Sequence, residues 1–147
     1  MTKREHITGF YLETLLLIVV FVAIILVLTQ VFGLSRAQSA EAKMLTNAVC
    51  LAQNAAEAVS AAESPEALLS LLDEGGNARA GERESVLATY DDDMRPDTEG
   101  PVTVEVTWEP SDGDERMIYS TVSVWRTGAS EPVYTLRTAA YLGEVSP

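Results

Sequence analysis

The chain has 147 residues, a formal net charge of −12 and a sequence pI of about 4.3, and 47% of its residues are hydrophobic. This length can form one small domain with an extension, but not two sizeable cores. The acidic excess argues against nucleic-acid binding through phosphate contacts, and the single cysteine, Cys50, excludes an intrachain disulfide.

The most apolar part of the chain is residues 10–34, and residues 15–28 carry no charge at all. At about 1.5 Å per residue, a helix over residues 10–34 is long enough to cross a hydrocarbon layer about 30 Å thick. A cleaved secretory signal is the alternative, with residues 40–42 (Ala-Glu-Ala) as its cleavage site. That site lies well beyond the apolar run, inside helix-forming sequence, so the pattern favours a membrane-spanning helix.

The orientation of this helix is predicted from its flanks. Lys3 and Arg4 precede the apolar run and Arg36 and Lys43 follow it, so the balance of basic residues is nearly even. The short N-terminal segment is the easier piece to keep inside. We therefore expect a single pass through the cytoplasmic membrane, with the N-terminus in the cytoplasm.

Residues 35–63 are predicted to continue the same helix in amphipathic form. They contain neither proline nor glycine, and Gly33 costs only about 1 kcal/mol relative to alanine, which is too little to end a long helix. Small and apolar residues recur on one face at helical spacing: Ala37, Met44, Ala48, Leu51, Ala55, Val59 and Ala62. The pattern predicts one helix from Phe10 to about Ala62, with its second half packed on a folded domain.

Residues 64–100 are predicted to form a short helix and loops. Ser64-Pro65-Glu66 is typical of a helix start, and Gly75-Gly76 of a helix end. Residues 77–84 are expected to be loop, and residues 85–90 to be a short strand.

Residues 101–147 are predicted to form an antiparallel sheet. Strands are expected at 102–108, 117–125 and 133–141, separated by turns at 111–114 and 127–130. A sheet this small needs a cover for its apolar face, and the alanine-rich face of the long helix can provide it. The predicted fold class is α+β: a long N-terminal helix packed on a three- or four-stranded antiparallel meander.

Gly9-Phe10, an acid a few residues into a long apolar run, an amphipathic continuation and a small sheet together resemble the type IV pilins and the pseudopilins of type II secretion and DNA-uptake systems. Residues 88–96 are also similar to a tyrosine-plus-acids segment in pilin-like proteins of gram-positive gut bacteria. The resemblance implies that residues 1–9 are a leader, cut after Gly9 by a membrane prepilin peptidase that then N-methylates Phe10. It also implies assembly with other pilin-like subunits into a cell-surface filament, on a platform driven by an ATPase.

Glu13 is the only acid in the apolar run. A carboxylate at the bilayer centre costs roughly 2.5 to 3.5 kcal/mol, so an intramembrane acid suggests a function. The resemblance implies that the free amine of Phe10 in one subunit pairs with Glu13 of another. Counting from Phe10, Glu13 is fourth where the family has its glutamate fifth, which rotates it by about 100° on the helix. The alternative is a boundary carboxylate near the cytoplasmic interface.

Catalytic, cofactor and metal sites are not expected. His6, the single histidine, lies in the leader, and Cys50 on the alanine-rich helix is interpreted as a packing residue. Some pseudopilins bind calcium, but neither acidic cluster has calcium-loop spacing, and both are interpreted as solvated: Asp91, Asp92, Asp93, Asp97 and Glu99 in one, and Asp112, Asp114 and Glu115 in the other.

Two function classes remain open. One is a filament subunit, and the absence of proline between Phe10 and Ser64 favours a minor pilin or pseudopilin over a major one. The other is an unprocessed single-pass protein whose sheet domain binds a partner outside the cell.

Overall fold

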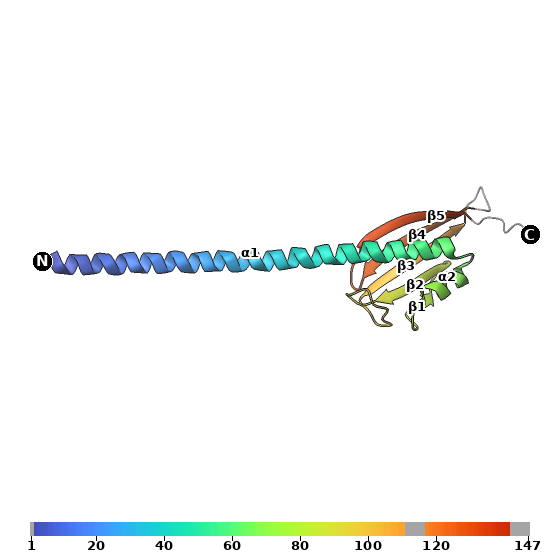
Figure 1. Cartoon of the computed structure of the whole chain (residues 1–147), viewed down its shortest axis with the longest axis horizontal. Helices are drawn as coiled ribbons and strands as arrows, with labels where there is room; N and C mark the ends of the chain where they lie inside the picture. The colour runs from blue at the N-terminus through green and yellow to red at the C-terminus, as the bar shows by residue number, and fades with distance from the viewer. Residues whose placement is uncertain (1, 111–116, 142–147) are drawn as a thin grey trace, which may run out of the picture. The chain divides into compact units, whose positions relative to one another are not determined.

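The computed structural model describes residues 2–110 and 117–141, and the side chains of residues 8–109 and 117–141. Two helices, α1 (Thr2–Ala61) and α2 (Pro65–Leu72), precede five strands (Figure 1). The chain divides into two compact units, Met1–Ala42 and Lys43–Pro147. The strands are β1 (Ala78–Ala80), β2 (Ser85–Tyr90), β3 (Val102–Pro110), β4 (Met117–Arg126) and β5 (Tyr134–Tyr141).

In the first unit, α1 is helical from Thr2 and continues through Gly33 without interruption. The predicted long helix is therefore confirmed, and it also includes residues ahead of its expected start at Phe10. Each large apolar side chain between Phe10 and Leu34 is at least 45% exposed. By length and composition, α1 is the one helix in the described part of the chain that could cross a membrane.

The second unit contains a five-stranded sheet in the order β1-β2-β3-β4-β5. Every strand pairs antiparallel with its neighbour in sequence, so the sheet is a meander, as predicted. On the central strands Val104 is opposite both Ala88 and Val124, and Val122 is opposite Leu136. This register places the buried apolar residues of all four longer strands on one face.

The sheet has one strand more than the three or four expected. Residues 77–84 were predicted to be loop, but Ala78–Ala80 forms β1 and pairs with β2. The prediction was wrong because Ala-Arg-Ala is too short to show a strand pattern and contains no β-branched residue. Three residues become a strand here because the exposed edge of β2 offers them hydrogen bonds.

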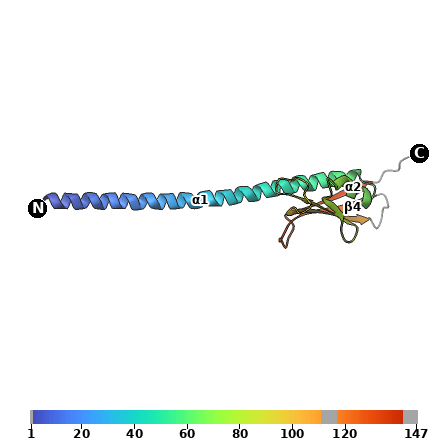
Figure 2. The ribbon, with the colours of Figure 1, turned by 90° about the horizontal axis from the view of Figure 1, so that it is seen from below.

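The core lies between the sheet and the part of α1 that belongs to the second unit (Figure 2). The predicted face of α1 contributes to this core, together with Ala52, which was not predicted. Leu68 and Leu72 of α2 cover one side of the core. Ala37 lies in the first unit and is exposed, so the predicted face begins to be covered only at Met44. The buried residues of α1 and the segment after it are Ala48, Leu51, Ala52, Ala55, Val59 and Ala62.

The predicted helix signals of the second unit are present in the structure. The Ser64 side chain accepts a hydrogen bond from the Ala67 amide at 3.2 Å and so caps α2. Gly75 and Gly76 follow α2 with φ of 91° and 88°, the left-handed region that favours glycine. The turn expected at 111–114 lies outside the described residues.

Candidate functional site

The residues predicted for processing and assembly lie at the start of the apolar run. Gly9, Phe10 and Glu13 follow one another on the first turns of α1, and all three are exposed. The positions of Phe10 and Glu13, three residues apart, are neighbours on one side of the helix. A Cβ at Gly9 would have no other atom within 4 Å, so the backbone there is accessible on that side.

Two threonines in this run satisfy their hydroxyls locally. Thr14 Oγ1 donates to the Phe10 carbonyl at 2.9 Å, and Thr29 Oγ1 donates to the Ile25 carbonyl at 2.8 Å. By contrast, the Glu13 carboxylate forms no hydrogen bond or ion pair with any described residue. A carboxylate in apolar surroundings needs a counter-charge or a proton, so Glu13 is the charged group in this run that a partner could satisfy.

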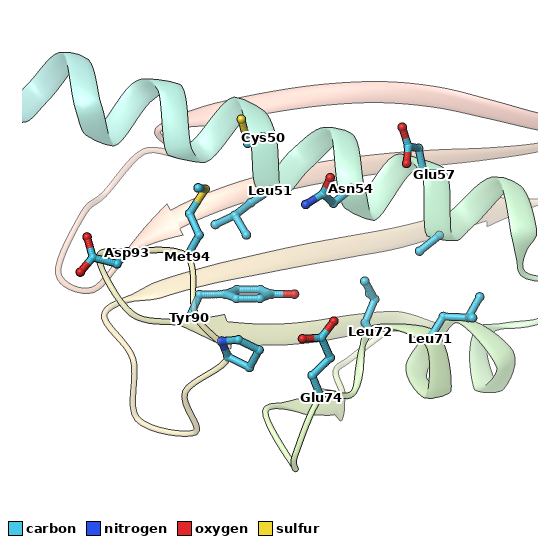
Figure 3. A pocket seen from close by; sticks show the side chains of 12 residues that line it. Cys50, Leu51, Asn54, Glu57, Leu71, Leu72, Glu74, Tyr90, Asp93 and Met94 are labelled. Carbon is cyan, nitrogen blue, oxygen red and sulfur yellow. The ribbon is translucent and has the colours of Figure 1, made fainter.

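The second unit contains a cavity of about 510 Å³ between α1, α2, the end of β2 and the loop that follows β2 (Figure 3). Leu51, Leu72 and the ring of Tyr90 form its apolar interior, and Met94 lies toward Cys50 at one end. Glu57 on α1 and Glu74 after α2 are exposed and lie on opposite rims. A cavity of this size is within the range of ligand sites.

The loop between β2 and β3 is organised by its acids. The Asp91 carboxylate accepts hydrogen bonds from the amides of Asp93 and Arg95, at 2.8 Å and 2.9 Å. Asp97 accepts in the same way from the Glu99 amide at 3.0 Å. These aspartates were interpreted as simply solvated, whereas Asp91 is half-buried and holds the loop together.

Contacts to α1 and β4 fix this loop in place. Lys43 Nζ lies 2.8 Å from Asp93 Oδ1, and Asn47 donates to the Asp92 carbonyl at 2.9 Å. Arg126 of β4 approaches the Asp92 carboxylate at 3.6 Å. In the part of the chain that the structure describes, no three potential metal-ligating side chains gather into one group. The acids at 112–115 lie outside the described residues.

The electrostatics of the cavity follow from these contacts. The hydrogen bond from Lys43, together with its charge, lowers the pKa of Asp93, and the same pairing raises the pKa of Lys43. Burial raises the pKa of Tyr90, the Glu74 carboxylate adds to this, and a hydrogen bond with Asn77 opposes it. Tyr90 therefore stays a neutral phenol beside an acidic rim.

Cys50 is half-buried and lines this cavity as a free thiol, rather than lying in the centre of the core. The cavity as a whole was not predicted from the sequence. Asn54 and Glu57 stand off the apolar face of the helix, but only the folded chain brings them near Tyr90 and Glu74.

No protein-family model matches the chain, and no curated protein or solved structure matches it significantly. What is shown is the class of fold: a long helix, apolar in its N-terminal half, followed by a five-stranded antiparallel sheet that packs on the end of the helix.

Proposed function

We propose that this chain is a structural subunit of a type IV pilus or pseudopilus, processed after Gly9 and assembled through its N-terminal helix. The observation that carries the proposal is the apolar run of α1. Its large side chains, from Phe10 to Leu34, are exposed all round the helix, although burying even one of them is worth about 1.5 to 3 kcal/mol. Such a surface must be covered by lipid or by other helices, or by lipid first and by helices later.

A pilin-like subunit meets both surroundings. Before assembly its apolar helix spans the cytoplasmic membrane, with the N-terminus inside, and after extraction by the assembly platform it packs among the helices of neighbouring subunits. The second unit then lies at the filament surface. The unbroken helix, without a proline between Phe10 and Ser64, supports a minor pilin or a pseudopilin over a major pilin.

Cleavage gives the proposal its chemistry. A peptidase that cuts after Gly9 leaves an ammonium group on Phe10, and a charged amine and the Glu13 carboxylate are each costly to bury alone. Pairing the amine of one subunit with Glu13 of the next neutralises both and sets their axial register, as a buried polar residue does in a coiled coil.

The mass of the mature N-terminus tests processing directly. Protein isolated from its native cells is expected to lack residues 1–9 and to begin with an N-methylated Phe10. Gly9→Leu should block the cut, because a side chain at this position obstructs an extended backbone in the peptidase site. Gly33→Leu is the matched control, since both glycines lie on exposed helix with nothing near their Cα hydrogens. An intact Met1 on the wild-type chain would refute the proposal and favour the single-pass protein.

The assembly pair is tested separately. Glu13→Gln keeps the shape of the side chain and removes its charge, so sedimentable filaments should be lost while processing continues. A double variant, Glu13→Thr with Thr14→Glu, keeps the composition and moves the acid to the fifth position from Phe10, where the family has its glutamate. Assembly of this variant would show that the family's position also serves this chain, and its failure would show that register depends on Glu13 where it stands. Normal filaments from Glu13→Gln would refute the ion pair. Glu13 would then be interpreted as a boundary carboxylate near the cytoplasmic interface.

A further inference from the structure

The cavity of the second unit is a site that neither membrane insertion nor helix packing explains. It opens between α1, α2 and the loop after β2, and it is lined by both apolar and acidic side chains (Figure 3). We propose that this cavity binds an arginine side chain presented by a partner protein. The inference concerns the second unit alone and holds whether or not the N-terminus is processed.

The charges around the cavity select a cation. Glu57 and Glu74 stand on its two rims, and neither carboxylate has a hydrogen bond or ion pair with a described residue. Asp93 at the far end is already engaged by Lys43. Among the described residues that line the cavity, none is basic. The Glu74 carboxylate points toward the interior and Glu57 lies at the outer edge of the cavity on α1, so the two unpaired carboxylates give the opening a negative potential that attracts a positive group (Figure 3).

The interior fits the stem of a long side chain. Leu51 and Leu72 are almost fully buried at the base, with exposed fractions of 5% and 7%, and Met94 covers one end. An arginine side chain can lay its methylene groups along such a surface while its charged head stays at the rim. A small, fully hydrated cation would leave this apolar surface uncovered.

Hydrogen-bond acceptors favour arginine over lysine. The guanidinium group has five N–H donors in a planar fork that matches carboxylates. Around the cavity it would find the carboxylates of Glu57 and Glu74, the amide oxygen of Asn54 and the hydroxyl oxygen of Tyr90. The raised pKa of Tyr90, caused by burial and then by Glu74, agrees with a negative field that reaches the interior.

The occupant is a protein segment because the cavity exceeds a single side chain. Its volume of about 510 Å³ leaves room for the residues that flank the arginine. The net charge of −12 also attracts a basic partner at long range, so association should be fast at low salt and slow at high salt.

The test uses the full chain in zwitterionic detergent micelles and the probe peptide acetyl-Leu-Arg-Leu-amide. NMR titration is expected to show saturable shifts of the Met94 methyl and the Tyr90 ring, with the Val122 and Val124 methyls unmoved. A peptide with citrulline in place of arginine has the same shape without the charge, and it should bind at least about tenfold more weakly. Equal binding of the citrulline peptide would overturn the proposal.

Variants of the protein locate the site. Glu57→Gln and Glu74→Gln should each weaken binding of the arginine peptide by about fivefold, since each removes one carboxylate with little change of shape. Glu131→Gln removes the same charge from an exposed turn on the second unit and should change binding less than about twofold. Equal losses in all three would show non-specific attraction to an acidic surface and contradict the site.

Two further probes identify the occupant. A lysine peptide that bound as tightly as the arginine peptide would overturn the choice of a guanidinium. Arginine amide alone should bind much more weakly than the peptide, because it lacks the flanking side chains. If it bound equally well, the site would take a small molecule and not a partner protein.

Discussion

Lys43 Nζ of α1 and Asp93 Oδ1 of the loop after β2 lie 2.8 Å apart, although 50 positions separate the two residues in the chain. One helical turn further on, Asn47 donates to the backbone of Asp92 at 2.9 Å. The two contacts hold the loop against α1, and that loop carries Asp93 and Met94 to the wall of the cavity. The position of one wall therefore depends on a surface ion pair and a hydrogen bond to the backbone.

The pairing of Lys43 with Asp93 gives a prediction about pH. The folded pKa of Asp93 is below its ordinary value of 3.8, so its contribution to stability is present above pH 3.8 and is lost as pH falls through the folded value. The folded pKa of Lys43 is above its ordinary value of 10.5, so its contribution is present below pH 10.5 and is lost as pH rises through the folded value. Between these two limits the contribution of the pairing to stability does not change with pH.

Lys43→Met should raise the pKa of Asp93 toward its ordinary value, as measured by NMR titration of the Asp93 carboxyl carbon. Arg137→Met is the control, because it removes an equal charge from a different ion pair. In that pair the guanidinium group of Arg137 on β5 lies 4.0 Å from the carboxylate of Glu109 on β3. Both ends of the Lys43 pair are more than half exposed, so salt at 1 M should weaken the effect. An unchanged Asp93 pKa in Lys43→Met would show that the pair does not persist in solution.

Position 100 is predicted to tolerate no residue other than glycine. A Cβ at this position would overlap the carbonyl group of Tyr90, and that group is backbone that cannot turn aside. Gly100→Ala should therefore lower the free energy of unfolding by at least about 2 kcal/mol, a large overpacking cost. Gly128→Ala is the comparison: Gly128 has a φ of 83° but open space around it, so only the left-handed conformation is penalised, by about 1 to 2 kcal/mol. Urea denaturation followed by tryptophan fluorescence measures both. Equal losses would show that the Tyr90 loop adapts.

Local patterns predicted most of the fold. The spacing from Ala48 to Ala62 predicted the covered face of α1, and the alternation in residues 102–108 predicted the covered face of β3, since Val102, Val104, Val106 and Trp108 are buried. In both cases the periodicity of the backbone decides which side chains face the core. The extra strand β1 was missed because its cause is the unpaired edge of β2, and not its own sequence.

The cavity could not be predicted, for a related reason. Glu57 and Glu74 are separated by α2, and each by itself is an ordinary exposed acid. What makes them a candidate site is the apolar interior between them, which exists only after α2 has folded against β2. Glu13, by contrast, is conspicuous in the sequence because it is the only acid in the apolar run of residues 10–34.

Small residues on α1 are predicted to set its distance from the sheet. Ala52 has an exposed fraction of 0%, so a larger side chain there must push the helix away or leave its preferred rotamer. Ala52→Leu should cost about 1 to 3 kcal/mol in unfolding free energy despite the added apolar surface. Ala61→Leu, on an exposed position of the same helix, should stay within about 0.5 kcal/mol of the wild type. A stabilising Ala52→Leu would indicate spare volume between helix and sheet.

Two neighbours on β4 should respond in opposite ways to the loss of their side chains. Val122 is fully buried opposite Val106, and Val122→Ala removes two methyl groups from packed surroundings, at a cost of about 2 to 3 kcal/mol. Ser120 is equally buried, but its hydroxyl has no hydrogen-bond partner among the described residues. Ser120→Ala should therefore leave stability within about 0.5 kcal/mol of the wild type or raise it, because a buried unpaired hydroxyl carries a desolvation penalty.

The same urea titration, read from the fluorescence of Trp108 and Trp125 together, compares the two β4 variants under identical conditions. Ser120→Val adds a test of volume, since it replaces the hydroxyl by a methyl group and adds a second one. If Ser120→Ala lost more than about 1 kcal/mol, the hydroxyl would be hydrogen-bonded in solution, and the serine would be a polar anchor of the sheet and not a defect in its core. The slope of the titration should stay the same in both alanine variants, because neither changes the surface that unfolding exposes by more than a few atoms.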